Sequence, residues 1–416
     1  MRLPMLFHTL KTYDKSQFLA DFQAGVTVAM VAIPLSLAIA IASGAPPATG
    51  LITAVVAGFL ISAFGGSRVQ IGGPTGAFIV VVFSVIMDHG YDGLVLATFM
   101  AGGILILAGL LRLGRFIALV PESVVEGVTC GIAVIIAASQ LKDFFGFDAG
   151  TLPAEVLPKL AILWTARDSL SPATLAIGLL TMGLILVLKR LYPKFPGLLV
   201  AVSIGSGLVV LLQLPVDTIV SRFGALPDHL PWPQLPVITI ARLIELLPSA
   251  MVIAFLAGLE SLLSAMIADK MTGETHRPNA ELLGQGIANV GSALVGGLPA
   301  TGALARTATN VQAGAKTPVA GLIHAFTVLA VLMLAAPLAG YLAMPALAAL
   351  LLLAAWNMCP PATVLHGLKA AWPERVLFLG TLVLTVLVDL TVSLGVGIVA
   401  GLALRAWRQR SATSAH

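Results

Sequence analysis

Charged residues are scarce in this chain. They make up 10% of its 416 residues, against 58% hydrophobic residues, whereas a water-soluble domain carries about 25% charged residues. Loops alone could not keep this much apolar surface in water, so the sequence indicates a protein that lies in lipid. The net charge of +4 is typical of the cytoplasmic loops of membrane proteins. There is no basic stripe with interleaved aromatic residues, which argues against a nucleic-acid partner.

Cysteine is nearly absent as well. The two cysteines, Cys130 and Cys359, lie in or beside apolar runs and fit neither a disulfide framework nor a metal site. Walker and dinucleotide-binding loops are missing, and no nucleophile–base or metal constellation appears. The sequence therefore predicts no cofactor, no enzyme and no ATP-driven pump, which leaves transport driven by gradients.

Long apolar runs recur from one end of the chain to the other. A helix needs about 20 residues to cross the hydrocarbon layer. The first run follows about 20 mixed residues and no cleavage site, so it is retained as a span rather than removed as a secretory signal. We predict fourteen membrane segments, at 22–43, 48–64, 75–87, 93–111, 122–141, 172–188, 197–214, 243–267, 280–296, 303–314, 318–337, 341–356, 374–389 and 391–407.

The placement of basic residues supports this count. With fourteen segments both termini lie on one side, and 17 of the 23 Lys and Arg residues then fall on the cytoplasmic side of a bacterial inner membrane. One more, Arg306, lies inside a segment. The remaining five fall on the outer side: Lys142, Lys159, Arg167, Arg222 and Arg242.

Two of the segments are too short to span. Residues 75–87 and 303–314 would each cover only about 18–20 Å as a helix, and each follows a Gly- and Pro-rich stretch. Such backbone survives at membrane depth only when it is buried in protein or lines a cavity. Pro74-Thr75-Gly76-Ala77 also matches residues 299–303 at an offset of 226. These are the third segments of two sets of seven, which is typical of an inverted-repeat transporter.

Half-helices of opposite topology point their N-termini toward each other near the middle of the membrane. Unpaired N–H groups and the helix dipole make each N-terminus attractive to anions. The small residues Gly76, Ala77 and Ala305 would let a ligand approach these amides. We therefore predict an anion site between the two short segments.

Two charged residues lie near this predicted site. Arg306 falls in the first turn of the second short segment, where it could bind the anion or provide positive charge beside it; it could instead neutralise an acid. Glu260 lies in an apolar run at about mid-depth, and a carboxyl there is a functional hypothesis by default. It could couple transport to protons, or form a static pair with Arg306. Glu122 and Glu126 fit a solvated helix face, and His324 is expected to be satisfied by a neighbour.

The chain resembles the membrane domain of the sulfate permease (SulP) family of anion transporters. The resemblance runs over essentially the whole chain. It is carried by the motifs Asp21 to Ala29 with Ile33-Pro34, Gly73 to Gly76, Pro121 to Gly127, Gly258 to Ser261, Arg306 to Asn310, and Val388-Asp389-Leu390.

The resemblance implies an all-α membrane protein with a seven-plus-seven inverted repeat and an elevator-like cycle. The first repeat would be 22–214 and the second 243–407, between a cytoplasmic N-terminal segment (1–21) and a cytoplasmic tail (408–416). A core bundle (22–111 and 243–337) would carry the substrate against a gate bundle (112–214 and 341–407).

Family site residues carry over to matching positions here. The resemblance places substrate at Leu35, Ile39, Thr75, Gly76, Ala77, Leu304, Ala305 and Arg306. It assigns proton coupling to Glu260, with Ser264 and Pro34 in support. Sodium-coupled relatives tend to lack the arginine, so Arg306 favours protons. Members usually continue into a cytoplasmic STAS domain, whereas this chain ends about ten residues after its last predicted segment.

The leading hypothesis is proton-coupled symport of a small anion such as sulfate, bicarbonate or a dicarboxylate such as fumarate. The expected partners are this anion, protons and membrane lipid; a homodimer is left open. An anion channel or exchanger-like conduit is one alternative. A nucleobase permease of the same architecture is another, although the scarcity of aromatic residues near both short segments argues against it.

Overall fold

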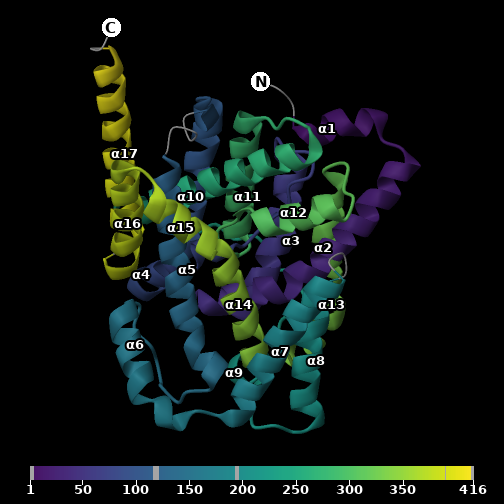
Figure 1. The fold of residues 1–416 in the computed structure, drawn as a ribbon. Helices are drawn as coiled ribbons and strands as arrows, with labels where there is room; N and C mark the ends of the chain where they lie inside the picture. The colour runs from purple at the N-terminus through teal and green to yellow at the C-terminus, as the bar shows by residue number, and fades with distance from the viewer. Residues whose placement is uncertain (1–3, 116–120, 193–195, 389, 414–416) are drawn as a thin grey trace.

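A computed structural model describes residues 4–115, 121–192, 196–388 and 390–413, so Asp389 and the last residues of the predicted tail lie outside the described residues. Figure 1 shows a bundle built almost entirely from helices, with α1 and the end of α17 at the same end of the molecule. The α-helices are α1 (Met5–Thr9), α2 (Lys15–Ala42), α3 (Pro47–Phe64), α4 (Ile79–Leu110), α5 (Glu122–Phe145), α6 (Val156–Thr165), α7 (Pro172–Leu191), α8 (Gly197–Leu211), α9 (Ile219–Phe223), α10 (Ile240–Thr272), α11 (Pro278–Leu294), α12 (Leu304–Gln312), α13 (Val319–Gly340), α14 (Met344–Met358), α15 (Pro361–Lys369), α16 (Trp372–Leu387) and α17 (Leu390–Thr413).

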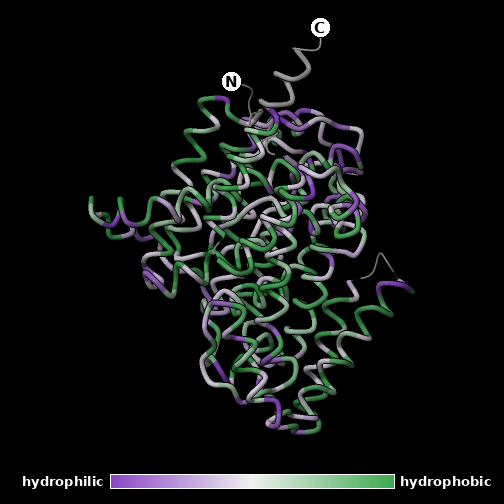
Figure 2. Tube along the Cα trace, turned by 60° about the vertical axis from the view of Figure 1, so that its left-hand side comes forward, coloured by the Kyte–Doolittle hydropathy of each residue, from purple (hydrophilic) through white to green (hydrophobic). Residues whose placement is uncertain are grey.

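A helix lies over each of the predicted segments. Two of them, 75–87 and 93–111, share α4, which is broken at Gly90, where φ is 71° and ψ is 177°. In the described part of the chain, eight helical stretches are long and apolar enough to cross a membrane, and hydrophobic residues cover most of the helices in Figure 2. An α-helical, multi-pass membrane protein is thus confirmed. The total of fourteen spans in two sets of seven stays a prediction.

The helices pack into two groups. One group, here called the half-helix group, contains α2, α3, α4, α10, α11, α12 and α13, which pack mainly on one another. The other, here called the flanking group, contains α5, α7, α8, α14, α15, α16 and α17. The two groups meet mainly where α2 packs on α14 and α8, and where α4 packs on α5. The core and gate bundles that the family resemblance implies stay a prediction.

The Gly- and Pro-rich stretches before the two short segments are extended and lie side by side. Strand β1 (Gly72–Gly73) pairs antiparallel with β2 (Thr301–Gly302), and the pairs are Gly72 with Gly302 and Gly73 with Thr301. All four residues are buried. The predicted non-helical backbone is therefore present. Its strand residues pair with each other inside the protein, as they must where the surrounding lipid offers no hydrogen-bond partners.

Helix α11 supplies partners for further backbone groups of these stretches. The Glu281 carboxylate accepts from the backbone N–H of Gly66 at 2.8 Å and of Ser67 at 3.2 Å. Asn289, two helical turns later, accepts from the N–H of Ala300 at 2.9 Å and donates to its carbonyl at 2.8 Å. Positions 281 and 289 lie on one face of the helix. One polar stripe on α11 thus anchors both extended stretches.

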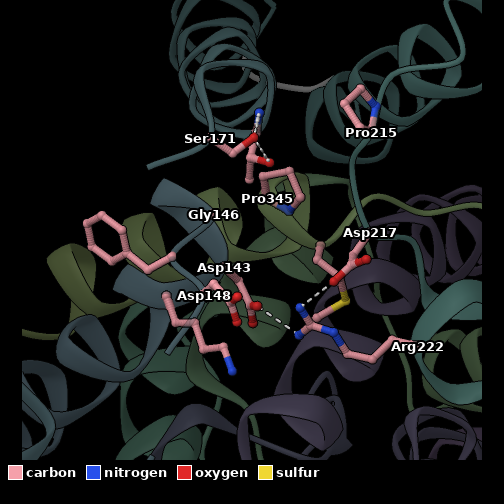
Figure 3. Close-up of a pocket in the computed structure, with 12 residues that line it drawn as sticks. Asp143, Gly146, Asp148, Ser171, Pro215, Asp217, Arg222 and Pro345 are labelled. Carbon is pink, nitrogen blue, oxygen red and sulfur yellow. Dashed lines mark hydrogen bonds and ion pairs between the residues drawn. The ribbon is translucent and has the colours of Figure 1, made fainter. Parts of the chain in front are cut away.

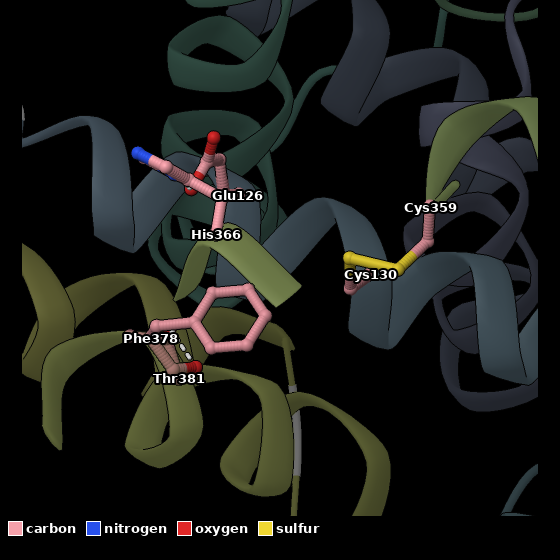
Figure 4. Close-up of a disulfide and its surroundings, with 6 residues drawn as sticks. All are labelled: Glu126, Cys130, Cys359, His366, Phe378 and Thr381. Carbon is pink, nitrogen blue, oxygen red and sulfur yellow. Dashed lines mark hydrogen bonds and ion pairs between the residues drawn. A yellow bond between two sulfur atoms is a disulfide. The ribbon is translucent and has the colours of Figure 1, made fainter. Parts of the chain in front are cut away.

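The prediction about the cysteines is wrong. Cys130 on α5 and Cys359, just after α14, form a disulfide with their Cα atoms 4.8 Å apart (Figure 4). They are 229 residues apart in the chain, so their spacing carries no signal for pairing. Only the packing of α5 against α14 brings them together.

Three helices in the connections were not predicted as segments. These are α6, between α5 and α7, α9, between α8 and α10, and α15, between α14 and α16. With 10, 5 and 9 residues, each is too short to cross the hydrocarbon layer. All three belong to connections rather than to the predicted spans.

The double hydrogen bond of Asn289 makes a direct test of the anchoring. Asn289→Leu would leave the N–H and carbonyl of Ala300 unpaired in the interior, which destabilises a protein by about 1–3 kcal/mol per group. We expect a clear fall in the melting temperature of the detergent-solubilised protein. Asn357→Leu, on the exposed side of α14, is the control and should melt like the wild type. Equal melting temperatures for all three proteins would contradict the anchoring role.

Candidate anion-binding site

The two short helical segments begin next to the β1–β2 pair. Thr75 is the N-cap of a 3-10 turn (Gly76–Phe78) that leads into α4. Ala303 is the N-cap of α12, and its N–H donates to the carbonyl of Ile71 at 2.8 Å. Because the strands are antiparallel, the helical segments leave the pair in opposite directions. Their N-terminal amides therefore converge on one region, where both dipoles favour negative charge.

The internal match needs a correction of register. The sequence aligned Thr75 with Thr301, but Thr301 lies within β2 and donates to the carbonyl of Ala257 at 2.7 Å. The position equivalent to Thr75 is the other N-cap, Ala303. The alignment was out by two residues because Thr-Gly-Ala begins at the N-cap in the first stretch and two residues before the N-cap in the second.

The predicted substrate residues differ in how accessible they are. Leu304 is 41% exposed and Ala305 is exposed too, whereas Leu35, Gly76 and Ala77 are half-buried. Ile39 and Thr75 are buried, with 2% and 6% exposure. The accessible part of the site is therefore formed by the first turns of the two short helical segments and by α2.

The flanking group closes over one side of this region. A side chain at Gly76 would come within 3.3 Å of the Met358 sulfur on α14 and 3.6 Å of Ile136 Cδ1 on α5. Sequence analysis did not single out Met358 or Ile136, since an apolar residue on an apolar helix carries no signal. They give the region a wall that belongs to the other helix group.

Glu260 reaches the first short segment from α10. Its Oε2 accepts a hydrogen bond from Thr75 Oγ1 at 2.8 Å, and its side chain is half-buried. The predicted carboxylate and the predicted N-cap residue thus meet, although they are 185 positions apart. A carboxylate at this position lies directly beside the amides that would hold an anion.

Arg306 turns away from the accessible side. It is 1% exposed, and its Nη2 donates to Ser36 Oγ on α2 at 3.0 Å. A Cβ atom on Gly73, whose φ is 153°, would lie 2.4 Å from Arg306 Nη1. No ion pair joins Arg306 to Glu260 in the described ranges. The alternative of a static pair between them is therefore not what the structure contains.

Ser264 and Pro34 lie behind the site rather than in it. Both are buried. Ser264 Oγ donates to Thr307 Oγ1 at 3.3 Å, and Thr307 Oγ1 also accepts from the N–H of Ile71 at 3.1 Å. Pro34 interrupts the hydrogen-bond ladder of α2. Ser36, the partner of Arg306, was missed because a serine inside an apolar helix more often bonds to its own backbone, as Ser36 also does.

Other polar residues also differ from expectation. Both ring nitrogens of His324 are buried and have no hydrogen-bond partner among the described residues, so the neighbour expected for it is absent there. Glu126 is within 3.6 Å of His366 on α15 (Figure 4), rather than on a freely solvated face. A pocket that includes Asp143, Asp217 and Arg222 (Figure 3) contains none of the predicted site residues.

Comparison with known proteins agrees with this architecture. A profile of the Sulfate permease family matches residues 18–381. The chain belongs to the sulfate permease family. It is 41% identical over 408 residues to YvdB of Bacillus subtilis, whose designation as a sulfate transporter is provisional; the match covers 98% of this chain and 77% of YvdB. It is 34% identical to the bicarbonate transporter BicA of Synechocystis, over 91% of this chain and 68% of BicA.

Solved structures share the fold. The transmembrane domain of a cyanobacterial bicarbonate transporter BicA matches with a TM-score of 0.82 at 33% identity, over 92% of this chain and 98% of that one. The SLC26A9 structure matches with a TM-score of 0.87 at 16% identity, over 97% of this chain and 68% of that one. The second likeness concerns the fold alone. Family and relatives are transporters, not enzymes.

The hydrogen bond between Thr75 and Glu260 can be tested directly. Thr75→Val keeps the shape and removes only the hydroxyl, which makes no capping bond of its own. We expect anion affinity to fall about threefold to tenfold, the range of one hydrogen bond, measured by anion-dependent thermal stabilisation. Thr75→Ser retains the hydroxyl and should bind like the wild type. If valine and serine variants bound equally well, the hydroxyl would have no part in the site.

Proposed function

We propose that this protein is a secondary active transporter that carries a small anion together with protons. Sulfate, bicarbonate and dicarboxylates such as fumarate are the substrates under consideration. The observation that carries the proposal is the β1–β2 pair, which sets two helix N-termini beside one another with Glu260 hydrogen-bonded to one of them. The sulfate and bicarbonate transporters among its relatives support an anionic substrate.

Proton coupling follows from the position of Glu260. An anion at the N-terminus that begins at Gly76 would lie beside the Glu260 carboxylate, since Thr75 Oγ1 is 2.8 Å from that carboxylate. The negative charges of the bound anion and of the Glu260 carboxylate would repel each other strongly in a medium of low dielectric constant. Binding of the anion therefore favours uptake of a proton by Glu260, and by linkage a proton on Glu260 favours the anion. This reciprocal effect is the thermodynamic basis of symport.

Arg306 provides positive charge from behind the site. Its guanidinium lies beside Ser36 and Gly73 and is almost fully buried. At this position it attracts an anion through the field rather than by contact. Its buried charge is not neutralised by an ion pair with Glu260, so the field at the site stays positive.

The two helix groups support an elevator-like cycle on a seven-plus-seven repeat. In that cycle the half-helix group would act as the core bundle and carry the site, and the flanking group would act as the gate. Most packing lies within each group, and β1 with β2 joins the two halves of the chain inside one group. A body held together in this way can slide against the wall formed by α5 and α14 without disrupting its own site.

Uptake by proteoliposomes with a panel of radiolabelled anions, with and without an inward proton gradient, tests the function. Saturable accumulation that rises with the gradient is expected for one or more of the anions. A non-saturating anion current that follows voltage alone would favour the channel-like alternative. Uptake of uracil or xanthine in place of anions would favour a nucleobase permease.

Glu260→Gln tests the coupling. The amide can still accept from Thr75 but cannot take up a proton. We expect accumulation driven by the proton gradient to be lost, while exchange of labelled for unlabelled anion is kept. Glu245→Gln, the same replacement near the outer end of the same helix, should retain accumulation. Full gradient-driven accumulation by Glu260→Gln would show that another group carries the proton.

Arg306→Gln tests the field. A nearby buried charge contributes on the order of 2 kcal/mol at an effective dielectric constant near 20, so we expect anion affinity to fall tenfold or more. Lys270→Gln removes an exposed charge at the cytoplasmic end of α10 and serves as the control. Anion affinity in Arg306→Gln equal to that of the control would remove the arginine from the site.

A further inference from the structure

Two buried ionisable side chains beside strand β1 have nitrogen atoms that bond to nothing in the described part of the chain. His324 on α13 is 0% exposed, and neither of its ring nitrogens has a hydrogen-bond partner there. Arg306 is 1% exposed, and its Nε and Nη1 have none either. Buried polar groups in folded proteins are hydrogen-bonded to the protein or to internal water. The partners of these four nitrogens therefore call for an explanation.

Both side chains lie along one face of α3. A Cβ atom on Gly73 would lie 2.4 Å from Arg306 Nη1 and 3.7 Å from Ala54 Cα. A Cβ atom on Gly58 would lie 3.6 Å from His324 Nδ1. Positions 54 and 58 are one helical turn apart on the same face, and the charge of Arg306 acts on His324 electrostatically. The guanidinium and the imidazole thus lie at neighbouring turns of α3.

Gly58 leaves a small space next to the imidazole. The heavy atoms nearest to a Cβ atom on Gly58 would be the Gly72 carbonyl oxygen at 3.2 Å and two ring atoms of His324, at 3.6 and 3.7 Å. Gly50, two turns earlier on α3, differs, because a Cβ atom there would lie 2.0 Å from the carbonyl oxygen of Ser36. Close packing therefore requires the glycine at position 50. At position 58 the glycine borders a space lined by a carbonyl oxygen and an imidazole nitrogen.

Strand β1 directs the carbonyl of Gly72 toward this space. In an antiparallel pair, alternate residues bond to the partner strand. The N–H of Ala303 donates to the carbonyl of Ile71 at 2.8 Å, so Ile71 and Gly73 occupy the bonded positions and Gly72 faces the other way. Its carbonyl therefore lies on the side of α3. Because the same peptide group leads to Gly73, Arg306 Nη1 is a neighbour of this carbonyl as well.

We propose that this space binds an internal water molecule that links His324 and Arg306 to β1. The water accepts a hydrogen bond from the Arg306 guanidinium and donates one to the Gly72 carbonyl and one to His324 Nδ1. Three hydrogen bonds are the usual number for a buried water. Neutral histidine can accept at Nδ1 when its proton is on Nε2. The donors and acceptors around the space thus match those of one water molecule.

His324 acts through this water as a positioning residue for Arg306. The other side of the guanidinium is held by Ser36, so the water fixes the charge beside the strand pair from the side of α3. His324 itself does not touch the transported anion. The water site is independent of the proposed function, whereas its effect on anion affinity rests on that function, since it acts through the field of Arg306.

Three substitutions test the site. His324→Leu removes the acceptor, Gly58→Ala fills the space with a methyl group, and His324→Asn keeps a polar atom near the position of Nδ1. Affinity for sulfate, and for bicarbonate in a second series, is measured by anion-dependent thermal stabilisation of the detergent-solubilised protein. We expect the leucine and alanine variants to bind about threefold to tenfold more weakly, the range of one hydrogen bond. His324→Asn should stay within about twofold of the wild type.

A matched control and a double substitution separate positioning from general damage. Gly103→Ala, on α4, adds a methyl group where no atom lies within 4 Å, and it should bind like the wild type. In the Arg306→Gln background, His324→Leu should weaken binding by less than about twofold, because the group through which it acts is gone. An equal loss with and without Arg306 would make the role of His324 structural and overturn the positioning.

A wild-type structure at a resolution that shows ordered water tests the site directly. We expect density within hydrogen-bond distance of both His324 Nδ1 and the Gly72 carbonyl, and its loss in Gly58→Ala. A dry space, or a direct bond from His324 to the strand, would overturn the proposal and leave the proposed function standing. If the wild type bound neither anion, the proposed function would fall, and the density would still decide whether the water site exists.

Discussion

The pairing of Gly72 and Gly73 with Thr301 and Gly302 is the interaction on which the site depends. Extended backbone at membrane depth needs a partner for every N–H and carbonyl group. Antiparallel pairing satisfies these groups and brings together two stretches that are far apart in the chain. It also directs the following helical segments away from each other, so that their amides meet. Without the strand pair, the two helical segments would neither start close together nor run in opposite directions.

The side chains around the pair divide into those that hold it and those that give it chemistry. Glu281 and Asn289 on α11 form hydrogen bonds with backbone groups of the two stretches, so these side chains have a structural role. Glu260 and Arg306 remain beside the pair on different sides. In the proposed function, this carboxylate and this guanidinium would together bind an anion and respond to a proton.

Much of this was readable from composition and spacing. The scarcity of charge, the recurrence of apolar runs and two short segments after Gly- and Pro-rich stretches were enough to predict an α-helical membrane protein with interrupted helices. The depth of Glu260 within its apolar run singled it out, and the structure shows its hydrogen bond to Thr75; its function stays a prediction. Pairings at long range were not readable: the register of the repeat was out by two residues, and the disulfide between Cys130 and Cys359 was not foreseen. Hydrophobic periodicity predicts which residues are neighbours along a helix, but it does not predict contacts between helices.

The sequence by itself determined which segments are helical, where helices cannot continue and which charges lie within apolar runs. These properties follow from local backbone preferences and from transfer of residues into lipid, both of which act within a few turns of the chain. Only the tertiary structure decided that Arg306 bonds to Ser36 rather than to Glu260, and that Cys130 and Cys359 form a disulfide. The direction of a long side chain depends on which helices pack around it, and that packing joins residues hundreds of positions apart.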